Sequence, residues 1–205
     1  MTETLPVGLE FYWYETKDDK NYWGQIVASL HRLAFIREEL EVVSRIRDID
    51  LALERLAYHM ENYLIRTYEL RERVVKQLEV LAGYKEGDLS KLKSPKKRKD
   101  VLSKLSHLDR NIVDQCLQLL SILDDDMKLR NMNTHDTYLG LGLSTGYDIY
   151  DPHDALIDVQ DQESEYKKLR KILRKEITLK AQSYEEKITK IIDLTYELIK
   201  QKDFR

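Results

Sequence analysis

Apolar residues recur along this chain at steps of three and four, which is the period of an amphipathic α-helix. The pattern predicts long helices at about residues 21–48, 49–81 and 163–202, and another that begins at residue 95. The aromatic run EFYWY near the N-terminus is the one strong strand signal. Since glycine and proline are few, seven and three among 205 residues, we expect an all-α bundle of four or more long helices.

Polar segments predict where these helices begin and end. Gly83 supplies a stop for the second helix. Ser94-Pro95 has the order of an N-cap followed by proline at the first helical position, so the third helix should begin there. Residues 139–161 carry three glycines and an Asp-Pro pair, which predicts an irregular segment before the last helix.

The length of the last helix bears on how the chain assembles. About 40 helical residues span about 60 Å, which exceeds a compact bundle of this mass. We therefore expect a kink, or an overhang that packs on a second protomer in a homodimer. We divide the chain into an N-terminal aromatic extension at residues 1–20 and a single helical domain at residues 21–202.

Composition limits the classes of protein to consider. Charged residues make up 35% of the chain but the net charge is only −3, so any polyanion site must be local. The sequence has neither an uncharged run of about 20 residues nor a cationic N-terminal region followed by an apolar one. We expect a soluble, cytoplasmic protein with no membrane contact. Cys116 lies among aliphatic residues, so we expect a buried, unreactive thiol.

An arginine falls in the apolar phase of the third predicted helix. The stripe that reaches Met127 continues to Arg130. Because a buried, unpaired charge costs several kcal/mol, Arg130 needs a carboxylate, an inter-helix cleft or an external anion. His135 lies about 140° further around an unbroken helix, where the two side chains cannot converge on one atom. We therefore predict a helix break between them, with Asn133 or Thr134 capping a new turn.

Arg130, Asn131 and His135 form an arginine, a neighbouring polar residue and a histidine five residues after the arginine. This motif, placed after a long core helix, resembles that of the HEPN superfamily (higher eukaryotes and prokaryotes nucleotide-binding domains). The resemblance covers about residues 20–200. It implies a HEPN-like helical bundle with an irregular loop after the Arg-Asn-x3-His motif, paired so that two motifs face each other.

The same resemblance implies a function in defence, as a toxin or in stress RNA cleavage, with an antitoxin or another protein as a partner. In one subfamily, the toxins paired with nucleotidyltransferase antitoxins, a tyrosine stands two residues after the histidine. Here that position is Thr137, and the tyrosine is Tyr138. The chain therefore departs from the pattern of that subfamily.

The residue types of the motif suit RNA cleavage without a metal or cofactor. Such cleavage needs a base for the 2′-hydroxyl proton, an acid for the leaving oxygen and fixed donors for the phosphoryl charge. His135 can transfer protons near neutral pH, and Arg130 presents a planar, permanently charged fork that matches phosphate. Asn131 can position the imidazole or the substrate. The resemblance implies the same roles and a product with a 2′,3′-cyclic phosphate end.

Two alternatives stay open for these residues. Arg130 could instead pair with Asp124, Asp125 or Asp126 while His135 caps a helix end, which would make a structural hinge. The chain could also be a non-catalytic helical module that binds nucleotide, RNA or a protein partner. The three consecutive carboxylates do not predict a metal site, because neighbouring helical side chains point about 100° apart.

A basic cluster marks the start of the third predicted helix. Lys96, Lys97, Arg98 and Lys99 place positive charge at a helix N-terminus, where it opposes the macrodipole. An external anion would explain this choice, and so would a solvated linker. With Tyr138, these four residues are the candidate nucleic-acid contacts.

Overall fold

The computed structural model describes residues 22–92, 94–135 and 159–203. Within these ranges it describes the backbone alone for residues 95, 128–135, 159–166 and 202–203. The N-terminal aromatic extension, with its EFYWY run, and most of the irregular segment predicted at residues 139–161 lie outside the described residues.

Helices make up all the regular structure that the described residues contain, and no strand occurs among them. The prediction of an all-α protein of four or more helices is confirmed. The five helices are α2 (Trp23–Arg45), α3 (Ile49–Ala82), α4 (Pro95–Ser103), α5 (Arg110–His135) and α6 (Val159–Asp203).

The ends of α3 follow from two residues. The Asp48 carboxylate accepts hydrogen bonds from the backbone N–H groups of Asp50 and Leu51, which no helical carbonyl can satisfy. At the other end Gly83 adopts a φ of +68°, a left-handed conformation that lets the chain leave the helix. The predicted stop at Gly83 is confirmed.

The third predicted helix is two helices, which corrects the sequence analysis. It begins at Pro95 with Ser94 as N-cap residue, although the Ser94 side chain makes no capping hydrogen bond. The chain then leaves the helix after Ser103, and α5 begins at Arg110. The Asp109 carboxylate caps α5, and the Arg110 guanidinium donates to the carbonyls at the end of α4. These contacts stabilise a corner that leucine periodicity does not reveal.

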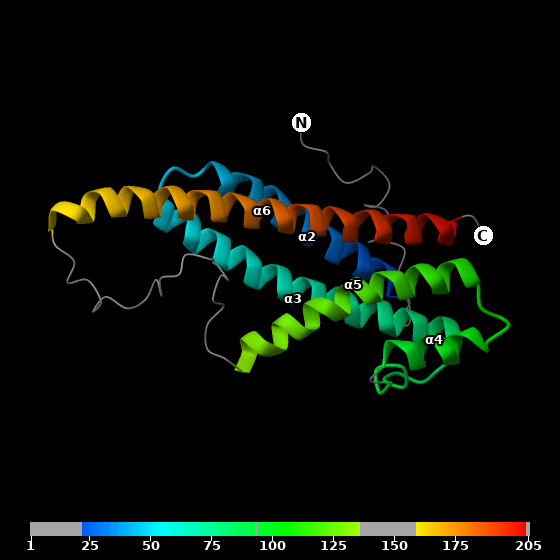
Figure 1. The fold of residues 1–205 in the computed structure, drawn as a ribbon. Coiled ribbons are helices and arrows are strands. Elements are labelled where there is room, and N and C mark those ends of the chain that lie inside the picture. The colour runs from blue at the N-terminus through cyan, green and yellow to red at the C-terminus, as the bar shows by residue number, and fades with distance from the viewer. Residues whose placement is uncertain (1–21, 93, 136–158, 204–205) are drawn as a thin grey trace.

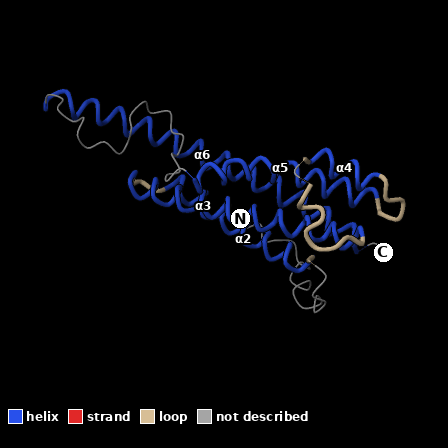
Figure 2. Tube along the Cα trace, turned by 90° about the horizontal axis from the view of Figure 1, so that it is seen from below, coloured by secondary structure: helices blue, strands red, loops and turns tan. Residues whose placement is uncertain are grey.

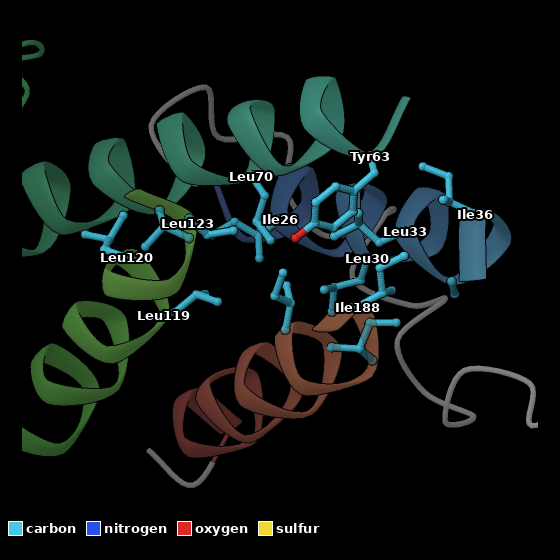
Figure 3. Packing of buried hydrophobic residues seen from close by; sticks show 14 of the residues in the cluster. Ile26, Leu30, Leu33, Ile36, Tyr63, Leu70, Leu119, Leu120, Leu123 and Ile188 are labelled. Carbon is cyan, nitrogen blue, oxygen red and sulfur yellow. The ribbon is translucent and has the colours of Figure 1, made fainter. Parts of the chain in front are cut away.

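The core lies between α2, α3, α5 and α6. Helix α2 packs against both α3 and α6, and α5 crosses α3 and α6, while the short α4 packs on α5 (Figures 1 and 2). Apolar side chains from the four long helices point into one interior, among them Leu30, Leu70, Leu119 and Ile188 (Figure 3). Burial of these side chains is the main stabilising contribution to the fold.

Helix α6 is longer than the bundle that it covers. It runs through 45 residues without interruption, which corresponds to about 65 Å. Its N-terminal part extends past the ends of α2 and α3 in both views (Figures 1 and 2). The structure therefore shows the overhang that the length of the helix suggests. Its packing on a second protomer stays a prediction.

Candidate active site at the end of α5

Arg130, Asn131 and His135 lie on the last two turns of α5. The backbone is helical through His135, so the predicted break between Arg130 and His135 is wrong. Asn133 and Thr134, either of which we expected to cap a new turn, do not end the helix. Five residues of unbroken helix separate the two positions by about 140° around the axis and about 7.5 Å along it.

A buried carboxylate anchors α5 one turn before the motif. Asp126 is 2% exposed, and its Oδ2 atom accepts a hydrogen bond of 2.6 Å from the hydroxyl of Tyr63 on α3. Its Oδ1 atom accepts from the ammonium group of Lys187 on α6. The edge of the Tyr184 ring meets Tyr63 at a centroid distance of 5.0 Å. Three helices are therefore joined one turn before the motif.

The electrostatics of this cluster keep Tyr63 in its neutral form. Burial raises the pKa of Tyr63, and the neighbouring Asp126 carboxylate raises it further. A neutral phenol is the form that can donate to the carboxylate. Lys187, whose side chain is 35% exposed, supplies the compensating positive charge. The cluster thus satisfies the buried charge, as a stable core requires.

A second carboxylate ties α5 to α3 and α4. Arg71 Nε donates to Asp124 Oδ1 at 2.6 Å, and Arg98 Nη2 donates to Asp124 Oδ2 at 2.8 Å. Arg71 also donates to Glu72 at 2.7 Å. Both carboxylates contact α3, but Asp124 also contacts α4 and Asp126 also contacts α6, and each has a cationic partner other than Arg130.

The basic cluster on α4 divides into two kinds of residue. Lys96, Lys97 and Lys99 are exposed to solvent. The Arg98 side chain is only 4% exposed and is held by Asp124, so it is not available to an external phosphate. The structure therefore assigns Arg98 to the packing of α4, and only the three lysines stay candidates for nucleic-acid contact. Tyr138 lies outside the described residues.

Two other residue types with reactive potential have structural surroundings. Cys116 is fully buried, and burial raises the pKa of its thiol to about 12, so it is held as the unreactive thiol. His59 is also buried, with Nε2 lying 3.6 Å from Glu39 Oε2. Burial lowers the pKa of His59 despite the nearby carboxylate. Cys116 lies almost four turns before Arg130 on α5, and His59 lies on α3.

The Asp126 cluster was not anticipated from the sequence. Tyr63 lies on the apolar stripe of its helix, where a tyrosine hydroxyl needs a polar partner. This need for a polar partner is the feature of the sequence that could have indicated the cluster. Nothing in the sequence around Lys187 distinguishes it from the other lysines of α6.

Comparisons with protein-family models, with curated protein sequences and with solved structures found no match for this chain. No helix that the structure describes is long and apolar enough to span a membrane. Within the same residues, no group of three histidine, cysteine or acidic side chains is arranged to hold a metal ion.

Proposed function

We propose that this protein is a metal-independent endoribonuclease of the HEPN type, active as a homodimer. The observation that carries the proposal is the position of the motif. Arg130, Asn131 and His135 occupy the last turns of a long helix, directly after the buried Asp126 cluster that fixes the helix against α3 and α6. Such an anchor holds the backbone of a site in place, which catalysis by positioned groups requires.

The unbroken helix favours a site shared between two chains. Five residues of unbroken helix set Arg130 and His135 about 140° apart around the axis of α5, so one chain alone is poorly arranged to bring both to one phosphate. Two copies related by a twofold axis solve this problem, because Arg130 of one copy then faces His135 of the other. The resemblance to HEPN domains, in which paired motifs face each other, suggests the same arrangement.

The proposed reaction is an internal displacement at phosphorus. His135 accepts the proton of the 2′-hydroxyl as the 2′-oxygen forms a bond to phosphorus. The bond from phosphorus to the 5′-oxygen breaks, and this oxygen takes a proton from a solvent water molecule. Arg130 stabilises the charge on the phosphoryl oxygens, and Asn131 orients the imidazole or the substrate. The products carry 2′,3′-cyclic phosphate and 5′-hydroxyl ends.

A non-catalytic module that binds nucleotide, RNA or a protein partner is the second candidate. The observation that favours it is the same unbroken helix, since a binding site tolerates wider separation of Arg130 and His135 than proton transfer does. Retention of RNA by wild type without any cutting is the outcome that this candidate requires.

Cleavage of single-stranded RNA in EDTA separates the two candidates. Wild type is expected to cut RNA without a divalent metal and to leave 2′,3′-cyclic ends, while RNA with a methylated 2′-oxygen stays intact because it lacks the nucleophile. His135→Ala should lose about 10²-fold or more in rate, a typical general acid–base contribution, with its melting temperature unchanged. If wild type leaves a broad panel of RNAs intact, the nuclease proposal fails.

A further inference from the structure

Residues 167–180 of α6 concentrate positive charge that neither residues 159–166, with three acidic and no basic residue, nor residues 181–203 share. Residues 167–180 include seven basic residues and one acidic residue. Residues 181–203 include four basic and five acidic residues. A chain with a net charge of −3 therefore carries a strongly basic segment on one part of one helix, which creates a local positive potential.

Three of these lysines share one face of α6. Lys168, Lys171 and Lys175 follow the spacing i, i+3 and i+7, which places them within an arc of about 60°. All three are exposed, whereas Leu173 and Ile177 on the other side of the helix are buried against the core. Among the residues that the structure describes, Lys171 and Lys175 have no ion-pair partner. We refer to Lys168, Lys171 and Lys175 as the lysine face.

The spacing of the charges along the segment is unfavourable for an isolated helix. Lys171 and Lys175 lie four residues apart. Residues four apart are neighbours on a helix surface, so this pair brings two positive charges together and destabilises the helix. A bound polyanion would offset this repulsion, whereas residues 181–203 of the same helix mix four basic with five acidic residues.

The lysine face lies toward the end of α6 that extends past α2 and α3 (Figure 1). This portion of α6 includes the turns that extend past the ends of α2 and α3 (Figures 1 and 2). The C-terminal end of α5, which carries Arg130 and His135, points toward the same end of the bundle (Figure 1). A single-stranded nucleic acid bound to this part of α6 would therefore lie at the same end of the molecule as the motif.

We propose that the lysine face of α6 binds the phosphate backbone of single-stranded RNA. Lysine ammonium groups contact phosphates as point charges and do not read bases, so this binding is independent of sequence and strongly dependent on salt. Within residues 167–180, Ile172 and Leu179 are the two large apolar side chains that are exposed. Two such residues form only a narrow apolar stripe for insertion into a bilayer. The surface therefore fits RNA better than it fits an anionic membrane.

This inference extends the proposed function, because it names a second contact for the same substrate. It does not require cleavage, so binding is measured with RNA that cannot be cut. The probe is a fluorescein-labelled single-stranded RNA with methylated 2′-oxygens, and the readout is fluorescence anisotropy over a range of salt concentrations. The test variant is Lys171→Gln/Lys175→Gln. The matched control is Lys190→Gln/Lys200→Gln, which removes the same charge from the balanced half of the same helix.

The lysine-face variant is expected to bind this RNA about tenfold more weakly than wild type. The slope of log K against log salt should become shallower by about 1.4, or about 0.7 for each lost phosphate contact. The control should stay within about twofold of wild type, because its lysines lie outside the basic segment. Circular dichroism melting should show that exposed lysine-to-glutamine changes leave the fold intact.

Four outcomes overturn the inference. Unchanged RNA affinity in Lys171→Gln/Lys175→Gln would do so, as would an equal loss in the control. A loss confined to Lys96→Gln/Lys97→Gln would move the RNA surface to α4. If the lysine-face variant loses only its binding to phosphatidylserine vesicles, the face is a membrane surface. If wild type cleaves ordinary RNA but the lysine-face variant binds RNA as wild type does, the RNA-binding role of the lysine face is rejected and the nuclease proposal stands. If RNA binds through the lysine face but wild type does not cleave it, the nuclease proposal is rejected and the RNA-binding role stands.

Discussion

Tyr63 of α3 donates a 2.6 Å hydrogen bond to Asp126 of α5, one helical turn before Arg130. The ammonium group of Lys187 on α6 contacts the other oxygen of the same carboxylate. This contact joins three helices at the point where α5 begins to present the motif. The proposed chemistry therefore depends on a cluster that fixes the backbone carrying Arg130, Asn131 and His135, the residues to which we assign catalytic roles.

Removal of the Asp126 carboxylate should cost stability. In Asp126→Ala the Tyr63 hydroxyl and Lys187 lose their shared acceptor, and the free energy of unfolding should fall by about 2–4 kcal/mol. This loss of stability lies toward the low end of the range for broken buried ion pairs. The Lys187 side chain is 35% exposed, so water can hydrate its ammonium group once the carboxylate is removed. Urea denaturation followed by circular dichroism measures the change. Asp193→Ala, an exposed position on α6, should change stability by less than about 0.5 kcal/mol.

Tyr63 should make stability depend on pH in alkali. Burial and Asp126 raise the pKa of Tyr63 in the folded state above its ordinary value of 10.0, so the unfolded chain loses this proton first. Stability is therefore lost as pH rises past 10, at about 1.4 kcal/mol per pH unit for one proton. Tyr63→Phe removes this contribution, so its stability should fall less steeply between about pH 10 and 11. Parallel slopes for the two proteins would contradict this account.

His59 should make stability depend on pH in acid. Burial lowers its pKa below 6.5, so the unfolded chain binds a proton before the folded chain does. The contribution is present above pH 6.5 and is lost as pH falls below that value. His59→Leu should therefore show a shallower loss of stability between about pH 6.5 and 5, measured by urea denaturation at each pH. His31→Gln, at an exposed position, should follow wild type.

A shared site requires a dimer. Multi-angle light scattering at micromolar concentration should give a mass of about twice 24.4 kDa. A monomer mass across the concentrations used for cleavage assays would leave the proposed site without its second half.

Periodicity predicts helices well in this chain because each long helix buries one apolar stripe. It failed at residues 104–109, since Leu102, Leu105 and Leu108 keep a helical spacing across a corner that Asp109 and Arg110 create through contacts with the backbone. The break predicted after Arg130 rested on the assumption that Arg130 and His135 converge on one atom, and it is wrong because the helix continues to His135.

The partners of the charged residues depend on tertiary structure. The sequence does not distinguish Arg98 from its lysine neighbours, yet the Arg98 side chain is buried because it forms an ion pair with Asp124 on α5. The pairing of Asp126 with Tyr63 and Lys187 joins residues more than 60 positions apart. Local pattern carries no information about such contacts. The motif itself is visible in the sequence because its residue types and spacing are local.

Mixing two inactive variants tests the central claim most directly. If each site takes Arg130 from one chain and His135 from the other, then Arg130→Ala and His135→Ala should each fail to cut RNA alone. Equal amounts, unfolded and refolded together, should recover about a quarter of wild-type activity in EDTA, because half of the dimers are mixed and each has one intact site. Normal cleavage by either single variant, or no recovery in the mixture when wild type is active, would contradict the account.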